Sequence, residues 1–138
     1  MQIMGILNVT PNSFSDGGRF IDPAVAIEHG RSLIADGADI IDIGGESTRP
    51  GAEPVPPERE WERIAGVVGT LSRETTVSVD TYHAYTAWRA VEAGAHIVND
   101  VTGGQGDPDM FAVVAGLDCD YVVQHGRGNA QSMNDLAT

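Results

Sequence analysis

Apolar and polar positions along the chain follow two periods, and clusters of Gly and Pro separate the segments. Short apolar runs rich in β-branched residues are typical of strands, whereas apolar residues recurring every three or four positions are typical of helices. The pattern predicts strands at residues 3–7, 39–43, 77–80, 96–99 and 121–124. It predicts helices at residues 23–36, 57–72, 83–92 and 108–115, with a polar tail after His125. Asp22 and Pro23 form a cap and first-turn proline that predict where the first helix starts.

The alternation of strands and helices without a hairpin signal indicates a parallel α/β sheet. An open doubly wound sheet and part of a (β/α)8 TIM barrel both fit this order. The sequence contains neither a G-x-G-x-x-G turn after the first strand nor a G-x-x-x-x-G-K-[ST] loop, which excludes two common nucleotide sites. Polar residues gather at one end of nearly every strand, which favours the barrel.

The length of the chain bounds how much of a barrel it can supply. A complete barrel takes about 250 residues, and this chain has 138. We therefore expect about five βα units of an incomplete barrel, with residues 1–138 forming the N-terminal portion of a single domain. An open five-stranded sheet is expected to expose its edges and an apolar face.

Composition limits the partners. The formal net charge is −12, which argues against nucleic acid because a phosphate backbone needs clustered Lys and Arg. The apolar stretches are too short for a membrane span, and no signal peptide opens the chain. The single Cys119 excludes an internal disulfide framework and predicts a reducing, cytoplasmic location.

Polar residues follow each predicted strand, and in a barrel these positions face one rim, where the active site forms. The alternative is that an Asp or Asn after a strand only caps the next helix. Two of the connections are longer than the ~2–6 residues common for βα loops; they span residues 9–18 and 46–52. Such loops are suited to clamping polar ligands. The strand-end residues are Asn8, Glu46, Asp80, Asn99, Asp100 and His125.

The residues also carry a family resemblance. Residues 8–18 resemble the dihydropteroate synthase signature NVTPDSFSDGG, and residues 39–52, DIIDIGGESTRPGA, resemble its second signature. VSVDT at 77–81 and HIVNDVTGG at 96–104 resemble the family's third and fourth strand ends. These matches occur in the family's order and cover nearly the whole chain.

The resemblance implies a (β/α)8 barrel that joins p-aminobenzoate to (7,8-dihydropterin-6-yl)methyl diphosphate and releases pyrophosphate. It implies that Asp80 and Asn99 bind the pterin ring, whose edge presents adjacent donors and acceptors. Asn8 is similar to the family's asparagine that helps hold Mg²⁺ with the pyrophosphate, where the metal stabilises the leaving group.

Further roles are implied for the two long loops. Asp16, Thr48 and Arg49 are expected to be catalytic, with Asp16 facing the cation that forms when pyrophosphate leaves in an SN1-like step. Phe14 and Pro50 are expected to wall the p-aminobenzoate pocket, where sulfonamides compete in this family. The expected substrate-binding residues are Asp80, Asn99, Ser47, Thr48, Arg49, Phe14 and Pro50.

The chain departs from the family pattern in places. Asn12 replaces the usual aspartate, and the later lysine-bearing and terminal R-x-H segments are absent. We therefore expect little or no synthase activity from this chain alone, and family homodimers form through later helices. Two alternatives stay open: a non-catalytic synthase-like paralogue or truncated ligand-binding product, and a pterin-binding methyltransferase domain. The loops at 10–18 and 46–52 favour the synthase over the methyltransferase.

Overall fold

Five parallel strands alternate with helices in the computed structural model of the chain, which describes residues 2–9, 22–45 and 55–123. The strands are β1 (Met4–Asn8), β2 (Ile40–Gly44), β3 (Thr76–Asp80), β4 (Ile97–Asp100) and β5 (Asp120–Val123). The helices are α2 (Pro23–Ala35), α3 (Pro57–Leu71), α4 (Ala84–Glu92) and α5 (Met110–Ala115). The predicted order of elements is confirmed. None of the helices in this part of the chain is long and apolar enough to cross a membrane.

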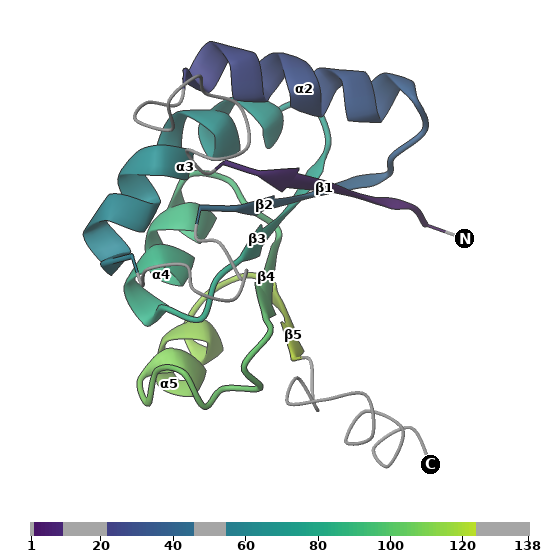
Figure 1. Cartoon of the computed structure of the whole chain (residues 1–138). Helices are drawn as coiled ribbons and strands as arrows, with labels where there is room; N and C mark the ends of the chain where they lie inside the picture. The colour runs from purple at the N-terminus through teal and green to yellow at the C-terminus, as the bar shows by residue number, and fades with distance from the viewer. Residues whose placement is uncertain (1, 10–21, 46–54, 124–138) are drawn as a thin grey trace, which may run out of the picture.

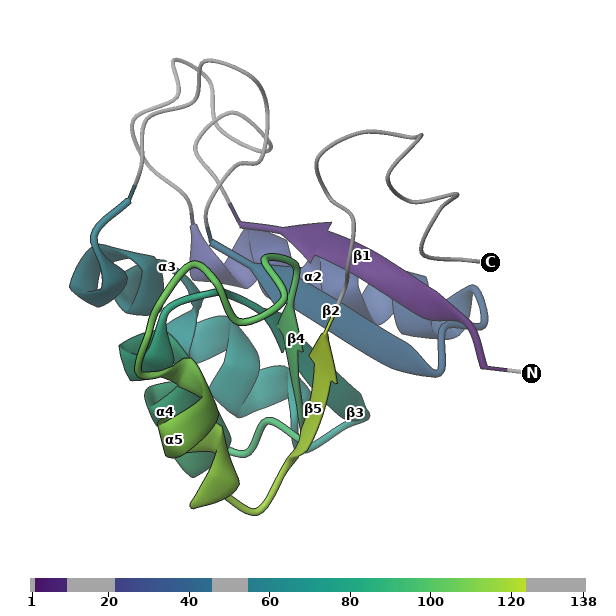
Figure 2. The same ribbon diagram turned by 90° about the horizontal axis from the view of Figure 1, so that it is seen from below.

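The strand order decides between the two architectures that the sequence left open. The sheet runs β1-β2-β3-β4-β5, so each strand pairs with the next one along the chain. A doubly wound sheet would instead reverse direction and carry helices on both faces. Here α2, α3, α4 and α5 follow one another over one face of a curved sheet (Figures 1 and 2). The described residues therefore form part of a (β/α)8 barrel, with five consecutive strands and the four helices that connect them, where about five βα units are predicted.

The hydrophobic core lies between the helices and the outer face of the sheet. Alternate strand residues point to this face, and those of β1, β2 and β3 pack on the buried sides of α2 and α3. A second, smaller cluster joins α4, α5 and β4. The larger core consists of Leu7, Val9, Ala26, Ile41, Ile43, Ile64, Val67, Val68, Leu71, Val77, Val79, Ala90 and Ala95.

The inner face of the sheet is more open, as expected for part of a barrel. Met4, Ile6 and Val122, on β1 and β5, expose 42%, 53% and 45% of their surface. In the described chain β1 pairs only with β2, and β5 pairs only with β4. Both outer edges of the sheet therefore carry unpaired backbone groups.

Most element boundaries differ from the prediction by one residue. β1, β2 and β4 each begin and end one residue later than predicted, and they end at Asn8, Gly44 and Asp100, because a polar or glycine residue at a strand end can stay in the ladder while an apolar run stops before it. The predicted cap of the first helix is confirmed, since Asp22 Oδ1 accepts a hydrogen bond of 2.9 Å from the Ala24 N–H. Helix α5 begins at Met110 rather than at residue 108.

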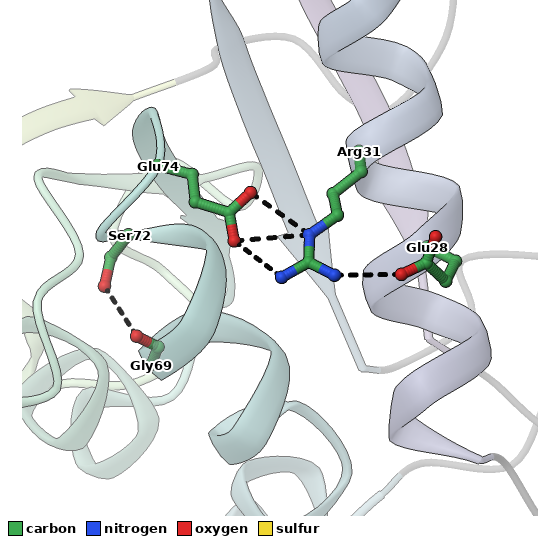
Figure 3. A network of polar contacts seen from close by, with 5 residues as sticks. All are labelled: Glu28, Arg31, Gly69, Ser72 and Glu74. Carbon is green, nitrogen blue, oxygen red and sulfur yellow. Dashed lines mark hydrogen bonds and ion pairs between the residues drawn. The ribbon is translucent and has the colours of Figure 1, made fainter.

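An ion pair joins α2 to the turn between α3 and β3 (Figure 3). Arg31 on α2 donates from Nη2 to Glu74 Oε2 at 2.9 Å and from Nη1 to Glu28 Oε1 at 2.9 Å. Hydrogen bonds from Arg31 lower the pKa of Glu74. Because these side chains are partly exposed, water and salt screen the attraction and its contribution to stability is small.

Gly30 allows α2 to pack closely on α3. A Cβ atom at this position would lie 2.5 Å from Cδ1 of the fully buried Leu71. We expect Gly30→Ala to destabilise the protein by about 1–3 kcal/mol through overpacking, although alanine favours helix. The measurement is urea unfolding.

Gly69 provides the matched control, because a Cβ atom there would meet nothing within 4 Å. Gly69→Ala should stabilise α3 by up to about 1 kcal/mol through helix propensity alone. Equal responses from the two variants would show that the contact at Gly30 does not limit helix packing.

Candidate active site

One row of side chains crosses the sheet at the carboxyl ends of the strands. The ladder pairs Asn8 with Gly44, Gly44 with Asp80, and Asp80 with Asn99. Because side chains alternate along a strand, all four residues share the inner face, opposite to the helices. The three predicted site residues that the structure describes, Asn8, Asp80 and Asn99, therefore lie in one row.

Gly44 keeps the middle of this row open. A Cβ atom at Gly44 would lie 3.6 Å from Asp80 Cβ and 3.8 Å from Asn8 Oδ1. Asn8 and Asp80 thus flank the glycine on the same face, and the space between them is not filled by the residue at position 44. A flat ligand could approach the backbone at this point.

Asp42 lies beneath the row, one step deeper on the inner face, and is only 3% exposed. Its Oδ1 accepts a 2.7 Å hydrogen bond from Ser78 Oγ and a longer one of 3.5 Å from Asn99 Nδ2. Because a carboxylate only accepts hydrogen bonds, the Asn99 amide must turn its NH₂ toward Asp42. Asp42 thereby orients Asn99 in the row above.

The sequence analysis assigned no role to Asp42. It occurs inside the apolar run Ile40–Gly44, where the pattern predicts only a strand. The sequence does contain one indication of its position. Asp42 and Gly44 are two residues apart on the same strand, so both lie on the inner face.

Burial raises the pKa of Asp42, and the hydrogen bonds from Ser78 and Asn99 oppose this shift. Burial dominates because it disfavours the charged form more than two hydrogen bonds stabilise it. The site therefore contains a carboxylate that costs folding free energy when it is ionised.

Asp100, the last residue of β4, does not join the row. Its carboxylate accepts hydrogen bonds from the backbone N–H groups of Thr102 and Gly104, and from Tyr121 Oη at 2.8 Å. Burial and this bond to Asp100 raise the pKa of Tyr121. The expectation that Asp100 faces the rim with Asn99 is wrong, because its side chain secures its own loop instead.

A second carboxylate also has a capping role. Asp107, in the loop before α5, accepts a 2.8 Å hydrogen bond from the N–H of Ala84, the first residue of α4. This bond and one from the Asp109 N–H lower the pKa of Asp107. The hydrogen bond from Ala84 to Asp107 thereby connects the start of α4, after β3, to the loop that follows β4.

The other predicted site residues belong to the two long loops and lie outside the described residues. This holds for the positions expected to be catalytic and for those expected to contact p-aminobenzoate, so their roles stay predictions. They are Phe14, Asp16, Ser47, Thr48, Arg49 and Pro50, together with Asn12, Glu46 and His125.

The row also presents oxygen atoms that could serve as ligands of a metal ion. Among the described residues no group of three His, Cys, Asp or Glu side chains could hold one. The row offers a neutral oxygen, Asn8 Oδ1, and a carboxylate, Asp80, on the two sides of Gly44. That set fits a hard cation that takes most of its ligands from a bound phosphate and from water.

Together, the sheet and its row define the class of protein: part of a parallel β/α barrel with a row of polar residues at the carboxyl ends of its strands, which is where ligand sites form in such barrels. The chain belongs to the pterin binding enzyme family, whose profile matches residues 4–138.

Known proteins similar to this chain are dihydropteroate synthases, which confirms the resemblance stated above. The synthase of Mycobacterium leprae is 51% identical over 128 residues, covering 92% of this chain and 45% of that protein. The Xanthomonas albilineans synthase with 4-aminobenzoic acid is 44% identical with a TM-score of 0.84, over 94% of this chain and 48% of that chain. The Anaplasma phagocytophilum synthase with bound 6-hydroxymethylpterin-monophosphate is 45% identical with a TM-score of 0.81, over 92% and 49%. The chain thus spans about half the length of these relatives.

The raised pKa of Asp42 makes a testable prediction about stability. A raised folded-state pKa contributes stability below the ordinary value of about 3.9, and this contribution is lost as the pH rises through the folded-state pKa. Asp42→Asn removes this loss and keeps an acceptor for Ser78 and Asn99. We expect the urea midpoint of the variant, relative to wild type, to increase between pH 4 and pH 7.5.

Asp36→Asn, which changes an exposed carboxylate at the end of α2, controls for the change in net charge. A relative midpoint for Asp42→Asn that fell with rising pH would mean that the ionised Asp42 stabilises the fold.

Proposed function

We propose that this protein contributes the N-terminal half of a dihydropteroate synthase site, which joins p-aminobenzoate to (7,8-dihydropterin-6-yl)methyl diphosphate and releases pyrophosphate. The observation that carries the proposal is the row Asn8–Gly44–Asp80–Asn99 with Asp42 beneath it. Two carboxylates and an oriented amide on the inner face of a barrel suit a flat ligand with several N–H groups.

In this proposal the pterin ring lies over Gly44, and its N–H groups donate to Asp80 and Asp42. Asn99 presents its carbonyl to the ring because its NH₂ is directed to Asp42. Hydrogen bonds to carboxylates are strong and directional, so an analogue without those N–H donors should bind more weakly. Recognition of the ring edge by Asp80 and Asn99 in the row, and by Asp42 beneath it, would give specificity for a pterin over other flat rings.

Asn8 would hold a Mg²⁺ ion that accompanies the diphosphate. When bound, the ion would neutralise charge on the departing pyrophosphate. The contribution of the chain is to place Asn8 Oδ1 at the edge of the row, beside the open space over Gly44.

The remaining roles fall to the long loops. Arg49 and Thr48, with Ser47, would bind the anionic groups, and Phe14 and Pro50 would contact p-aminobenzoate and competing sulfonamides. Asp16 would stabilise the positive charge that develops at the exocyclic carbon in an SN1-like transfer. We further propose a cytoplasmic location and, for the assembled synthase, a homodimer.

The proposal predicts that the row works inside a complete barrel. In a graft, the 128 aligned residues of the M. leprae synthase are replaced by those of this chain, where the two are 51% identical. We expect pyrophosphate release that depends on p-aminobenzoate, dihydropterin diphosphate and Mg²⁺. Asp80→Asn in the graft should lower kcat/KM by at least ~100-fold, since it removes a charged acceptor.

Gly44→Ala is the matched variant, because a Cβ atom there makes only ordinary contacts of 3.6–3.8 Å within the protein. It should fold normally and raise KM for the pterin substrate, since the methyl group enters the space proposed for the ring. A folded but inactive graft would favour a non-catalytic paralogue. Transfer from methyltetrahydrofolate to a corrinoid in its place would favour a methyltransferase domain.

A further inference from the structure

Glu60 is a buried carboxylate in a place where the sequence predicts an exposed one. It lies in the first turn of α3, within the charged segment of residues 57–63, yet it is 0% exposed. Glu58, in the same turn, is exposed and already supplies negative charge at the start of the helix. Helix capping therefore does not explain why Glu60 is buried, and burying a carboxylate is unfavourable unless it accepts good hydrogen bonds.

Two buried hydroxyl groups donate to the same oxygen of Glu60. Thr86 Oγ1, on α4, donates to Glu60 Oε1 at 2.6 Å, and Thr81 Oγ1, just after β3, donates to it at 3.0 Å. The Thr81 hydroxyl also accepts a 3.1 Å hydrogen bond from the His83 N–H. With its proton directed to Glu60 and a lone pair directed to His83, the hydroxyl of Thr81 is fixed on both sides.

Thr81 is also held to the next strand. Its backbone N–H donates to the Asn99 carbonyl at 3.2 Å, beyond the last ladder pair of β3 and β4. Asp80 directly precedes Thr81 and pairs with Asn99. The residue after Asp80 is thus anchored to α3 by its side chain and to β4 by its backbone.

The same helix also reaches the neighbouring strand end. Arg63, one turn beyond Glu60, donates from Nη1 to the Gly45 carbonyl at 2.9 Å. Gly45 directly follows Gly44, which belongs to the row of the site. A Cβ atom added to Gly45 would lie 3.1 Å from the Glu60 carbonyl oxygen. The first two turns of α3 therefore contact the chain directly after both Gly44 and Asp80.

We propose that Glu60 is a positioning residue of the ligand site. Glu60 accepts a hydrogen bond from the Thr81 hydroxyl, and this bond fixes the position and orientation of Asp80 relative to Asn99. This inference rests on the proposed function, because the ligand that Asp80 and Asn99 would bind is a dihydropterin. Glu60 itself lies on the helix side of the sheet and does not contact the ligand.

A matched pair of threonine variants tests the proposal in the 138-residue chain. Thr81→Val and Thr86→Val each remove one hydroxyl donor to Glu60 and keep the branched shape, but only Thr81 adjoins Asp80. Thr81→Val and Glu60→Leu should each weaken binding of 7,8-dihydropterin, measured by calorimetry, by at least ~10-fold. Both should speed hydrogen exchange of the His83 amide at least ~10-fold. Thr86→Val should change affinity less than ~3-fold, and Glu60→Gln, which keeps an acceptor, should recover most of the affinity lost in Glu60→Leu.

A purely structural role for Glu60 predicts a different result. Thr81→Val and Thr86→Val would then weaken binding equally, in proportion to their loss of stability in urea. Unchanged affinity and unchanged exchange at His83 in Glu60→Leu and Thr81→Val would equally overturn the proposal.

The exchange measurement separates this proposal from the proposed function. If the unmodified chain does not bind dihydropterin, the pterin site fails for this chain, and exchange alone then decides the role of Glu60. Glu60→Leu is the decisive variant, because it keeps the Thr81 hydroxyl that accepts from the His83 N–H. Faster exchange at His83 in this variant, with unchanged exchange at Ile41 and Ile43 in β2, supports the positioning role. Unchanged exchange at His83 contradicts it.

Discussion

The in-register pairing of the parallel strands is the constraint on which the rest of this structure depends. Because Asn8, Gly44, Asp80 and Asn99 are ladder partners, residues separated by up to 91 positions along the chain come into one row. A shift of one residue in any strand would send its side chain to the helix face. The outer face prevents such a shift, since Leu7, Ile43, Val79 and their neighbours would then lose their places in the core.

The two faces of the sheet use carboxylates in different ways. On the helix side, Glu60 and Asp100 are fully buried and are surrounded by hydroxyl and N–H donors from the loops. On the inner side, Asp42 accepts hydrogen bonds from Ser78 on β3 and Asn99 on β4, and burial raises its pKa. The first group fixes the loops, whereas the second retains an unfavourable charge that a ligand with N–H groups could stabilise. Residues that carry the same carboxylate group thus have a structural role on the helix side of the sheet and a proposed ligand-binding role on its inner side.

The sequence predicted the elements and three members of the row, because hydrophobic period and polar strand ends are local signals. Asn8, Asp80 and Asn99 each follow or end an apolar run, so their position at the rim could be predicted without knowing the fold in detail. Asp42 and Glu60 could not be found this way. Asp42 is enclosed by isoleucines and differs from a core residue only in strand parity, and Glu60 stands in a segment whose composition predicts solvent exposure. The partners of Glu60, Thr81 and Thr86, come from other elements, so its burial depends on tertiary packing alone.

The distribution of charge also orients the proposed substrate. The protein carries a net charge of −12, and the described part of the site has two carboxylates on the inner face, Asp80 in the row and Asp42 one step deeper. Carboxylates repel a diphosphate and attract N–H donors. In the proposed function, a substrate with a donor-rich ring at one end and a diphosphate at the other would therefore place its ring against these carboxylates and its phosphates away from them. On β1 the row ends in the neutral Asn8 rather than in a third carboxylate. The basic residue Arg49 follows Gly45 in the sequence. The carboxylates of β2 and β3 and the neutral amide of Asn8 on β1 would thus orient the proposed substrate, so the same residues would provide both its recognition and its orientation.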